Sequence, residues 1–315
     1  MIISASRRTD IPAYYSNWLV QRVEEGFCLV RNPINLAQIS RISLAPDVVD
    51  AFVFWTKNPT PMMNKLDAFD AFPYYFQFSL TGYGRDVETN LPDKNEVLIP
   101  AFQKLATRLR PERVIWRYDP ILFNDKYTPD YHLRVIEKIA SALEGSTEKC
   151  VISFVDTYAR NAEAMKELGA IEISDQDLRD FAARIVEIAG ARGIAVATCA
   201  EKMDLANVGI EHNCCVDPVL IGRIAGGEMK TGKDRNQRDG CGCAQSIDIG
   251  AYNSCLNGCK YCYANWDKDS VEKTAARYDW TAPMLCDQLK EGEVVREREM
   301  KRLLVPRWGD GTLFE

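Results

Sequence analysis

The chain contains 315 residues, which is enough for one large α/β barrel or for two ordinary domains. Hydrophobic residues make up 46% of it and charged residues 27%, as in a globular protein, and no apolar run approaches the roughly 18–20 residues that span a bilayer. The net charge of −6 argues against a nucleic-acid partner, whose phosphates require a basic surface.

The first residues, MIISASRRTD, pass directly from an apolar strand into charge. We therefore expect no signal peptide, a cytoplasmic location and no membrane partner.

Seven short apolar runs, each followed by polar residues, predict strands. Continuous apolar runs of this length suit strands that are buried on both faces of a parallel sheet. An early insert, residues 28–46, predicts a hairpin around Asn32-Pro33. The seven runs are IISAS (2–6), AFVFWTKNP (51–59), YYFQFSLTGYG (74–84), RVIWRYDP (113–120), CVISFVDTY (150–158), GIAVATCAE (193–201) and SIDIGAY (246–252).

Helical patterns lie between and after these runs. Residues 128–145 predict a helix that starts near Thr128 or Asp130, and residues 174–193 predict one capped by Ser174 and stopped by Gly193. Residues 95–109, interrupted by Pro100, and residues 264–278 are further candidates. The alternation of strands and helices indicates an α/β barrel or a doubly wound sheet, which we take as a single domain over residues 1–315.

Polar side chains follow the predicted strands. In (β/α) barrels this end of the strands carries the active site, so the pattern favours a barrel, although strand ends are generally polar. These residues are Arg7, Arg8, Lys57, Arg117, Asp119, Asp156 and Glu201.

The chain has eleven cysteines, a number that points to metal binding or catalysis in a protein without a signal peptide. Cys28, Cys150 and Cys286 are scattered, and we interpret them as small buried hydrophobic residues. The other eight fall within a cysteine-rich portion, residues 199–265.

Three of these cysteines, Cys255, Cys259 and Cys262, lie within CLNGCKYCYA (255–264), directly after a predicted strand. A structural zinc site takes four ligands, and a cubane iron–sulfur cluster has four corners. Three thiolates must therefore gain a fourth ligand from elsewhere or leave one position open. Zinc, with Cys241 or Cys243 as the fourth ligand, is the alternative to an open cluster.

The spacing Cys-x3-Cys-x-aromatic-Cys, with Tyr261 as the aromatic residue, resembles the motif of the radical S-adenosylmethionine (SAM) enzymes. The resemblance implies that the three thiolates hold a [4Fe–4S] cluster whose fourth iron binds SAM. An electron from the cluster would cleave SAM to a 5′-deoxyadenosyl radical, which abstracts hydrogen. It also implies a small-molecule substrate and a reductant similar to flavodoxin or ferredoxin.

A longer set of motifs resembles the DUF1848 family, a domain of unknown function. The set comprises SASRRTDIPAYY (4–15), VFWTKNPTP (53–61), YYFQFSLTGYG (74–84), VIWRYDPI (114–121) and CGCAQSIDIGAYNSCLNGCKYCYAN (241–265). The ending CKYCYA also resembles spore photoproduct lyase, which implies nucleic-acid lesion repair as an alternative function; the acidic balance argues against it.

Most radical SAM enzymes carry the cysteine motif after the first strand of a partial TIM barrel, whereas here it follows the last predicted strand. The resemblance thus implies a circularly permuted barrel. We expect the strand near Ile247 to pair with the strand near Ile3 and to close the sheet, since the terminal strands are neighbours in a closed barrel.

Four further cysteines could form a second site: Cys199, Cys215, Cys241 and Cys243, with Cys214 as a substitute for Cys215. Four thiolates would hold a second [4Fe–4S] cluster or zinc. The alternative to an enzyme is a non-catalytic metalloprotein whose metal centres are structural or transfer electrons.

The polar residues at the strand ends then receive expected roles. Arg7 and Arg8 would clamp a carboxylate or phosphate, or else form salt bridges. Arg117 and Asp119, two apart on one strand, would face inward and contact SAM or substrate, and Lys57 likewise. We expect cofactor binding, through hydrogen bonds to ribose or to an amino group, from Asp156 and Glu201, and we also place Tyr261 at the cofactor.

Overall fold

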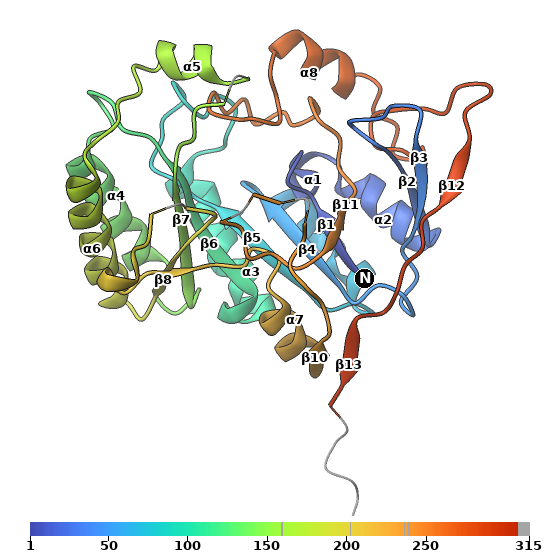
Figure 1. Ribbon diagram of the computed structural model, residues 1–315, viewed down its shortest axis with the longest axis horizontal. Helices are drawn as coiled ribbons and strands as arrows, with labels where there is room; N and C mark the ends of the chain where they lie inside the picture. Colours follow the sequence, from blue (N-terminus) through green and yellow to red (C-terminus); the bar gives the residue numbers. More distant parts are fainter. Residues whose placement is uncertain (159, 202, 236, 239, 308–315) are drawn as a thin grey trace, which may run out of the picture.

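The computed structural model describes residues 1–158, 160–201, 203–235, 237–238 and 240–307. Within these residues eight strands form one sheet in which every neighbouring pair is parallel (Figure 1). Their spatial order is β11 (Ser246–Asp248), β1 (Ile2–Ala5), β4 (Ala51–Thr56), β5 (Tyr74–Ser79), β6 (Val114–Ile121), β7 (Lys149–Phe154), β8 (Ala195–Thr198) and β9 (Glu211–His212). All seven predicted strands are present, and the α/β fold with a parallel sheet is confirmed.

The last predicted strand pairs with the first, as expected: Ile3 lies opposite Ile247 in a parallel register. The prediction of a closed barrel is wrong, because β11 and β9 remain the two edges of the described sheet. These edge strands contain three and two residues, so they offer few backbone groups with which to pair across the gap.

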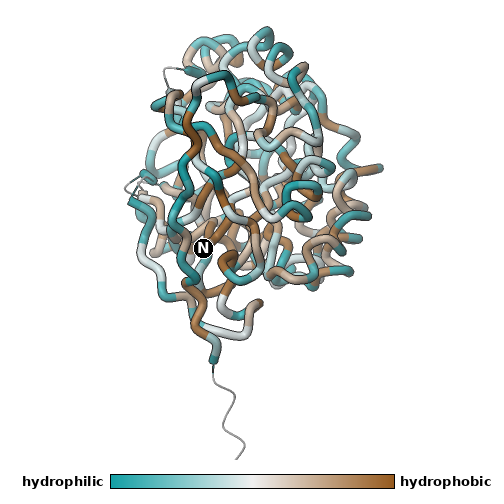
Figure 2. Tube along the Cα trace, turned by 90° about the vertical axis from the view of Figure 1, so that its right-hand side faces the viewer, coloured by the Kyte–Doolittle hydropathy of each residue, from teal (hydrophilic) through white to brown (hydrophobic). Residues whose placement is uncertain are grey.

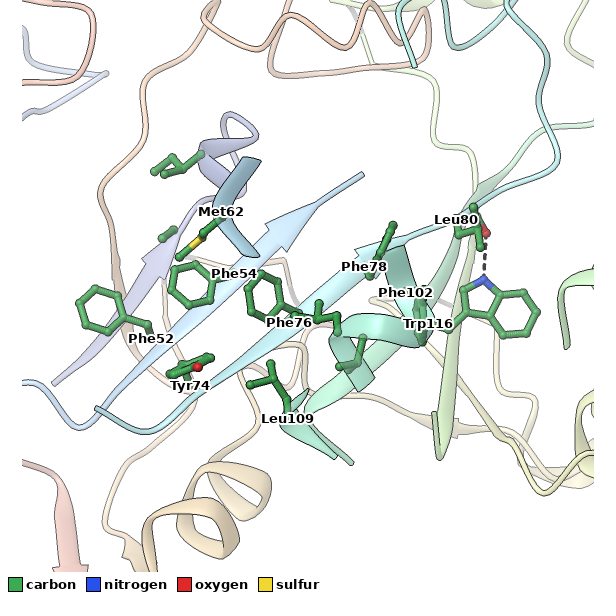
Figure 3. Packing of buried hydrophobic residues seen from close by; sticks show 14 of the residues in the cluster. Phe52, Phe54, Met62, Tyr74, Phe76, Phe78, Leu80, Phe102, Leu109 and Trp116 are labelled. Atoms are coloured by element: carbon green, nitrogen blue, oxygen red, sulfur yellow. Dashed lines mark hydrogen bonds between the residues drawn. The ribbon is translucent and has the colours of Figure 1, made fainter. Parts of the chain in front are cut away.

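The outer face of the sheet carries the larger hydrophobic core. Phe52 and Phe54 on β4 pack with Phe76 on β5, and the ring centroids of Phe54 and Phe76 are 4.8 Å apart (Figure 3). The indole of Trp116 is buried in the same cluster and donates a hydrogen bond of 2.8 Å to the carbonyl of Leu80. The elements that supply the opposing side chains are α2 (Ser16–Glu24), η1 (Thr60–Phe69), α3 (Ile99–Leu109), α4 (Pro129–Ala142) and α6 (Asp175–Gly190).

The predicted helices form close to their expected boundaries. Thr128 accepts a hydrogen bond from the N–H of Tyr131 and caps α4, and Ser174 caps α6 in the same way. Pro100 does not interrupt a helix: it lies in the first turn of α3, where its missing N–H is harmless, after the π-helical turn η2 (Lys94–Leu98). The helix expected over 264–278 is shorter, α8 (Lys268–Ala275).

The inner face of the sheet is covered by α7 (Pro218–Ala225) and the segments on either side of it. Leu220 and Ile221 of α7 share a buried cluster with Val53, Tyr75 and Ile115 of the sheet. These strand residues alternate with the residues of the outer core, as the two-residue period of a strand requires.

The remaining elements surround the sheet (Figure 1). The predicted hairpin is confirmed as β2 (Phe27–Arg31) and β3 (Ile39–Ser43), which β12 (Val295–Glu297) joins. Strands β10 (Gly227–Met229) and β13 (Leu304–Pro306) pair with each other. The short helical segments are α1 (Ile11–Tyr14), α5 (Ala162–Glu167), η3 (Pro111–Arg113) and η4 (Ala206–Val208).

Hydrophobic segments are concentrated inside the molecule, and hydrophilic ones run over its outer edge (Figure 2). None of the helices in the described part of the chain is both long enough and apolar enough to cross a bilayer.

His132 of α4 gives the fold a predictable response to acid. Its ring is fully buried, Nε2 donates to the carbonyl of Leu122 at 2.9 Å, and Nδ1 accepts from the hydroxyl of Tyr118 at 2.7 Å. Burial lowers the pKa of His132 to about 4. Since an unfolded histidine titrates near 6.5, we expect the free energy of unfolding to fall as the pH drops from about 6.5 to about 4, by up to ~1.4 kcal/mol per pH unit.

Urea unfolding at several pH values in this range measures the effect. His132→Gln should flatten the dependence, whereas the same substitution at the exposed His212 should leave it unchanged. Equal profiles for the two variants would show that His132 does not carry the pH dependence.

Candidate active site

The inner face of the sheet changes from apolar to polar toward the carboxyl ends of its strands. On β6 the inward positions run from Ile115, buried against α7, to Arg117 and then Asp119. Along β4 they run from Val53 toward Lys57, which follows the strand. Because the strands are parallel, these polar ends meet at one edge of the sheet, the edge where α/β proteins place their ligands.

Asp248, at the end of β11, joins the loop after β11 to the loop after β1. Its carboxylate accepts hydrogen bonds from Ser4 Oγ at 2.8 Å, Ser6 Oγ at 2.6 Å, the N–H of Arg7 at 2.8 Å and the N–H of Gly250 at 3.0 Å. The sequence analysis missed Asp248, although its place at the end of the strand in SIDIGAY matches the pattern that selected the other residues.

Arg7 and Arg8 lie on either side of this carboxylate network. The guanidinium of Arg7 lies 5.0 Å from the ring centroid of Trp55, and its Nη2 is buried without a hydrogen-bond partner in the described residues. Arg8 makes an ion pair of 3.8 Å with Asp248 and lies over the ring of Tyr252. A buried N–H group without an acceptor is costly, so Arg7 is suited to bind an anionic ligand.

The loop that carries Cys255, Cys259 and Cys262 is fixed to the chain just after Arg8. Asn257 donates to Asp10 Oδ2 at 3.0 Å and accepts from the hydroxyl of Tyr14 at 2.8 Å. The hydroxyl of Tyr15 donates to the carbonyl of Ser254 at 2.5 Å, and Asp10 also accepts from the N–H of Lys57 at 2.7 Å. The cysteine loop is therefore part of the edge of the sheet and not a separate module.

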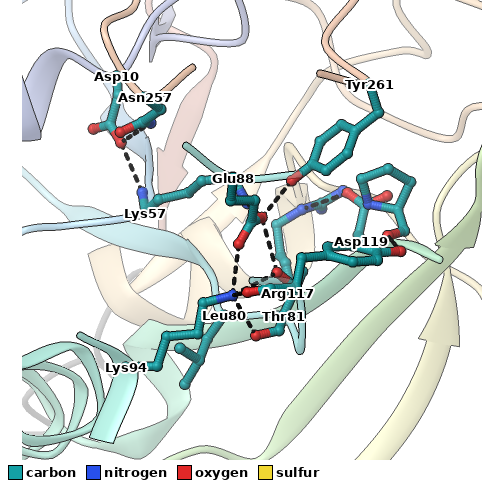
Figure 4. A network of polar contacts seen from close by, with 12 residues as sticks. Asp10, Lys57, Leu80, Thr81, Glu88, Lys94, Arg117, Asp119, Asn257 and Tyr261 are labelled. Carbon is teal, nitrogen blue, oxygen red and sulfur yellow. Dashed lines mark hydrogen bonds and ion pairs between the residues drawn. The ribbon is translucent and has the colours of Figure 1, made fainter. Parts of the chain in front are cut away.

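Glu88 is the centre of a buried ionic network beneath this loop (Figure 4). Its carboxylate is 2% exposed and accepts from Lys57 Nζ at 2.7 Å, Lys94 Nζ at 2.6 Å, Thr81 Oγ1 at 2.8 Å and the hydroxyl of Tyr261 at 2.5 Å. Burial alone would raise the pKa of Glu88, but the two ammonium groups outweigh burial and lower the pKa to about 2.

Neither Glu88 nor Lys94 was found by sequence reasoning. Both belong to the long connection after β5, where no strand end marks them as functional. Tyr261 was predicted to lie at the cofactor; its hydroxyl is bound to Glu88 in the described structure.

The three thiols of the cysteine loop are half-buried and interact electrostatically with one another. Burial raises the pKa of Cys259 to about 12, the Lys57 ammonium opposes this shift, and Glu88 and Cys262 add to it. The pKa of Cys255 is raised by burial, by the Asp10 carboxylate and by the neighbouring thiols of Cys259 and Cys262. The Lys57 ammonium therefore counteracts the rise in pKa at two of the three thiols, Cys259 and Cys262.

The other four predicted cysteines, Cys199, Cys215, Cys241 and Cys243, lie together on the inner side of the sheet. The sulfurs of Cys199 and Cys215 are 3.3 Å apart. The thiol of Cys243 interacts through hydrogen bonds with those of Cys215 and Cys241. By contrast, the thiol of Cys214 donates to the carbonyl of Gly242 at 3.0 Å. The group therefore contains Cys215, not Cys214.

Arg117 and Asp119 lie beside this second group. Arg117 forms an ion pair with Asp119, and its Nη1 donates to the sulfur of Cys215 at 2.9 Å. Asp119 also accepts from Ser153.

The two remaining predicted residues differ in their surroundings. Glu201 accepts from the N–H of Phe154 at 2.8 Å, and burial raises the pKa of Glu201 to about 7. Asp156 is exposed and pairs with Arg238 and Tyr158, so it lies outside the inner group.

No group of three or more His, Cys, Asp or Glu side chains among the described residues is placed to hold a single metal ion. A thiolate is a ligand of zinc and of iron–sulfur clusters alike, so the residue types of the two cysteine groups fit either kind of centre, while their present arrangement does not surround a single ion.

Comparison with known proteins identifies the family to which the chain belongs. A family model described as a domain of unknown function, DUF1848, matches residues 2–264, a segment that contains both cysteine groups. No curated protein matches the chain. No solved structure matches it either.

Replacing Glu88 should destabilise the fold strongly. Glu88→Gln leaves two largely buried ammonium groups without their counter-charge, and we expect the free energy of unfolding to fall by about 3 kcal/mol. Because the folded pKa of Glu88 is depressed, its contribution in the wild type is present above the unfolded value near 4.5 and is lost as the pH falls toward 2.

Denaturant unfolding at neutral and acid pH tests this expectation. Asp86→Asn is the matched control, because Asp86 lies in the same connection as Glu88 and makes an exposed ion pair with Lys126. This substitution should lower the free energy of unfolding by less than ~1 kcal/mol. If both variants cost the same at neutral pH, the buried network does not stabilise the fold.

Proposed function

The chain belongs to the DUF1848 family, a domain of unknown function, and we propose that it is a radical SAM enzyme with a [4Fe–4S] cluster on Cys255, Cys259 and Cys262. One observation carries the proposal. In the described residues Cys241 and Cys243, the candidates for a fourth ligand, interact with Cys199 and Cys215 instead. The loop thus supplies three thiolates, and the fourth corner of a cubane would be free for a small molecule.

The surroundings of the loop support an anionic cluster. Three thiolates bring negative charge into a partly buried place, where uncompensated charge is costly. The ammonium of Lys57 counteracts the pKa increase of Cys259 and so favours its thiolate form. Glu88 and Asp10 hold Lys57 by its side chain and its backbone. Lys57 would therefore be a positioned counter-charge for the cluster.

The order of strands also supports the proposal. The resemblance implies a partial barrel whose edge strand precedes the cysteine motif. Here the strand before the motif, β11, comes last among the seven predicted strands but lies at an edge of the sheet, beside β1. We accordingly propose a circularly permuted partial barrel that stays open.

When bound, the cluster and SAM would supply one chemistry, the reductive cleavage of SAM coupled to the abstraction of hydrogen from the substrate. The residues of the chain would bind and orient. Arg7, whose buried Nη2 has no partner in the described residues, would donate to the carboxylate of SAM. Arg117 and Asp119, farther along the inner face, would bind a small-molecule substrate. A reductant similar to flavodoxin or ferredoxin would supply the electron.

The test uses the full chain, reconstituted anaerobically with iron and sulfide. SAM should change the electron paramagnetic resonance spectrum of the reduced protein, and 5′-deoxyadenosine should form. Cys259→Ala should reduce both signals to background, because the cubane loses a corner. Cys28→Ala, which removes a cysteine buried in the core, is the control and should keep both.

Cys243→Ala discriminates between an open and a closed site. It should leave SAM cleavage at least partly intact. If it removes the SAM response as completely as Cys259→Ala, Cys243 is the fourth ligand and the enzyme proposal fails. Stoichiometric zinc without iron in the wild type would contradict the proposal equally.

A further inference from the structure

We propose that Cys199, Cys215, Cys241 and Cys243 form a second, closed metal site in which four thiolates hold either a [4Fe–4S] cluster or zinc. The inference does not depend on the proposed SAM chemistry, because it concerns other residues on another part of the inner face.

The four cysteines come from three separate segments of the chain. Cys199 directly follows β8, Cys215 precedes α7, and Cys241 and Cys243 lie in the segment before β11. Cys215 and Cys243 are 3% and 2% exposed, and Cys241 is 7% exposed. Cysteines from distant segments are thus brought into one group, of which three are buried and Cys199 is partly exposed.

The backbone holds these segments together independently of the sulfurs. The N–H of Ala244 donates to the carbonyl of Val216 at 3.0 Å, so the segments of Cys243 and Cys215 run side by side. Between Cys241 and Cys243 stands Gly242, where an added Cβ would lie 2.8 Å from the sulfur of Cys214. A side chain at this position would therefore have to displace the thiol of Cys214.

Hydrogen-bond donors are aimed at the sulfurs. Arg117 Nη1 lies 2.9 Å from the sulfur of Cys215, and Asn213 Nδ2 lies 3.5 Å from it. The N–H of Val216 donates to the sulfur of Cys243 at 3.4 Å. Such donors, and the buried guanidinium above all, match sulfurs that carry negative charge. A bound metal would keep such adjacent buried thiols deprotonated.

The arrangement also limits the kind of site. The thiols form a row in which Cys199 interacts with Cys215, Cys215 with Cys243, and Cys243 with Cys241. To bind a metal centre, these side chains would have to turn so that the sulfurs move apart. An open cavity of about 520 Å³, lined by Cys241, Gly242, Asn213 and Glu201 among others, connects the group with solvent and provides a path for metal. A disulfide would join only two of the four thiols and would not explain the hydrogen-bond donors that lie at the sulfurs of Cys215 and Cys243.

The experiment removes the first site so that the two proposals can fail separately. In the triple variant Cys255→Ala, Cys259→Ala, Cys262→Ala, anaerobic reconstitution should still give about four irons and four sulfides, or about one zinc, per chain. Iron with sulfide identifies a cluster. Zinc identifies a single ion, and Co²⁺ in its place should then give the absorption of a tetrahedral thiolate site.

A fourth substitution in this background identifies the ligands. Cys215→Ala should lower the metal content at least tenfold. Cys214→Ala, which removes the neighbouring thiol that points to Gly242, should leave it unchanged. Circular dichroism should show the same folded state in both variants before metal is added.

The inference is overturned if the triple variant binds no iron, zinc or Co²⁺, or if Cys214→Ala removes as much metal as Cys215→Ala. If the wild type fails to cleave SAM while the triple variant still holds its metal, the second site stands and the proposed function falls.

Discussion

The parallel pairing of β11 with β1 is the contact on which the arrangement of the site depends. The strands are neighbours in space although they are separated by more than two hundred residues, and the carboxylate of Asp248 binds the loops that follow both. This pairing sets the loop with Cys255, Cys259 and Cys262 at the same edge as the polar ends of β4 and β6. Together with the hydrogen bonds from Asn257 to Asp10 and from Tyr15 to the carbonyl of Ser254, it fixes the cysteine loop relative to Arg7 and Lys57.

Buried charge is the second constraint at this edge. Glu88 compensates two ammonium groups, and Asp119 compensates Arg117, so neither carboxylate could be lost without leaving a cation uncompensated. Arg7 differs, because one of its buried N–H groups has no partner in the described residues. The same edge thus combines groups held in fixed ion pairs with one group that still has hydrogen-bonding capacity.

The two cysteine groups have different neighbours. The three-cysteine loop interacts with Lys57, Glu88 and Asp10, and the four-cysteine group is in contact with Arg117. Different cations therefore act on the two groups: Lys57 on the first, and Arg117 and Arg7 on the second. Such a division is what two separate metal centres would need, since each thiolate set carries negative charge that must be balanced locally.

Local patterns determined much of the fold. The seven apolar runs form seven of the eight strands of the sheet, and Thr128 and Ser174 cap two of the predicted helices. Both features could be predicted because burial on both faces and capping leave a pattern within a few residues of sequence. The same local reasoning found the residues at strand ends, including Lys57, Arg117 and Asp119.

Tertiary structure alone decided the rest. Strands of two or three residues such as β9, β10 and β12 carry no periodicity. The eight-stranded sheet stays open between β9 and β11, two short edge strands that offer little backbone for pairing. Glu88 became a network centre only because a long connection folds back over Lys57. Cys214 and Cys215 are adjacent and chemically identical in sequence, and the direction of each side chain in the folded chain separated the one that joins the cysteine group from the one that bonds to Gly242.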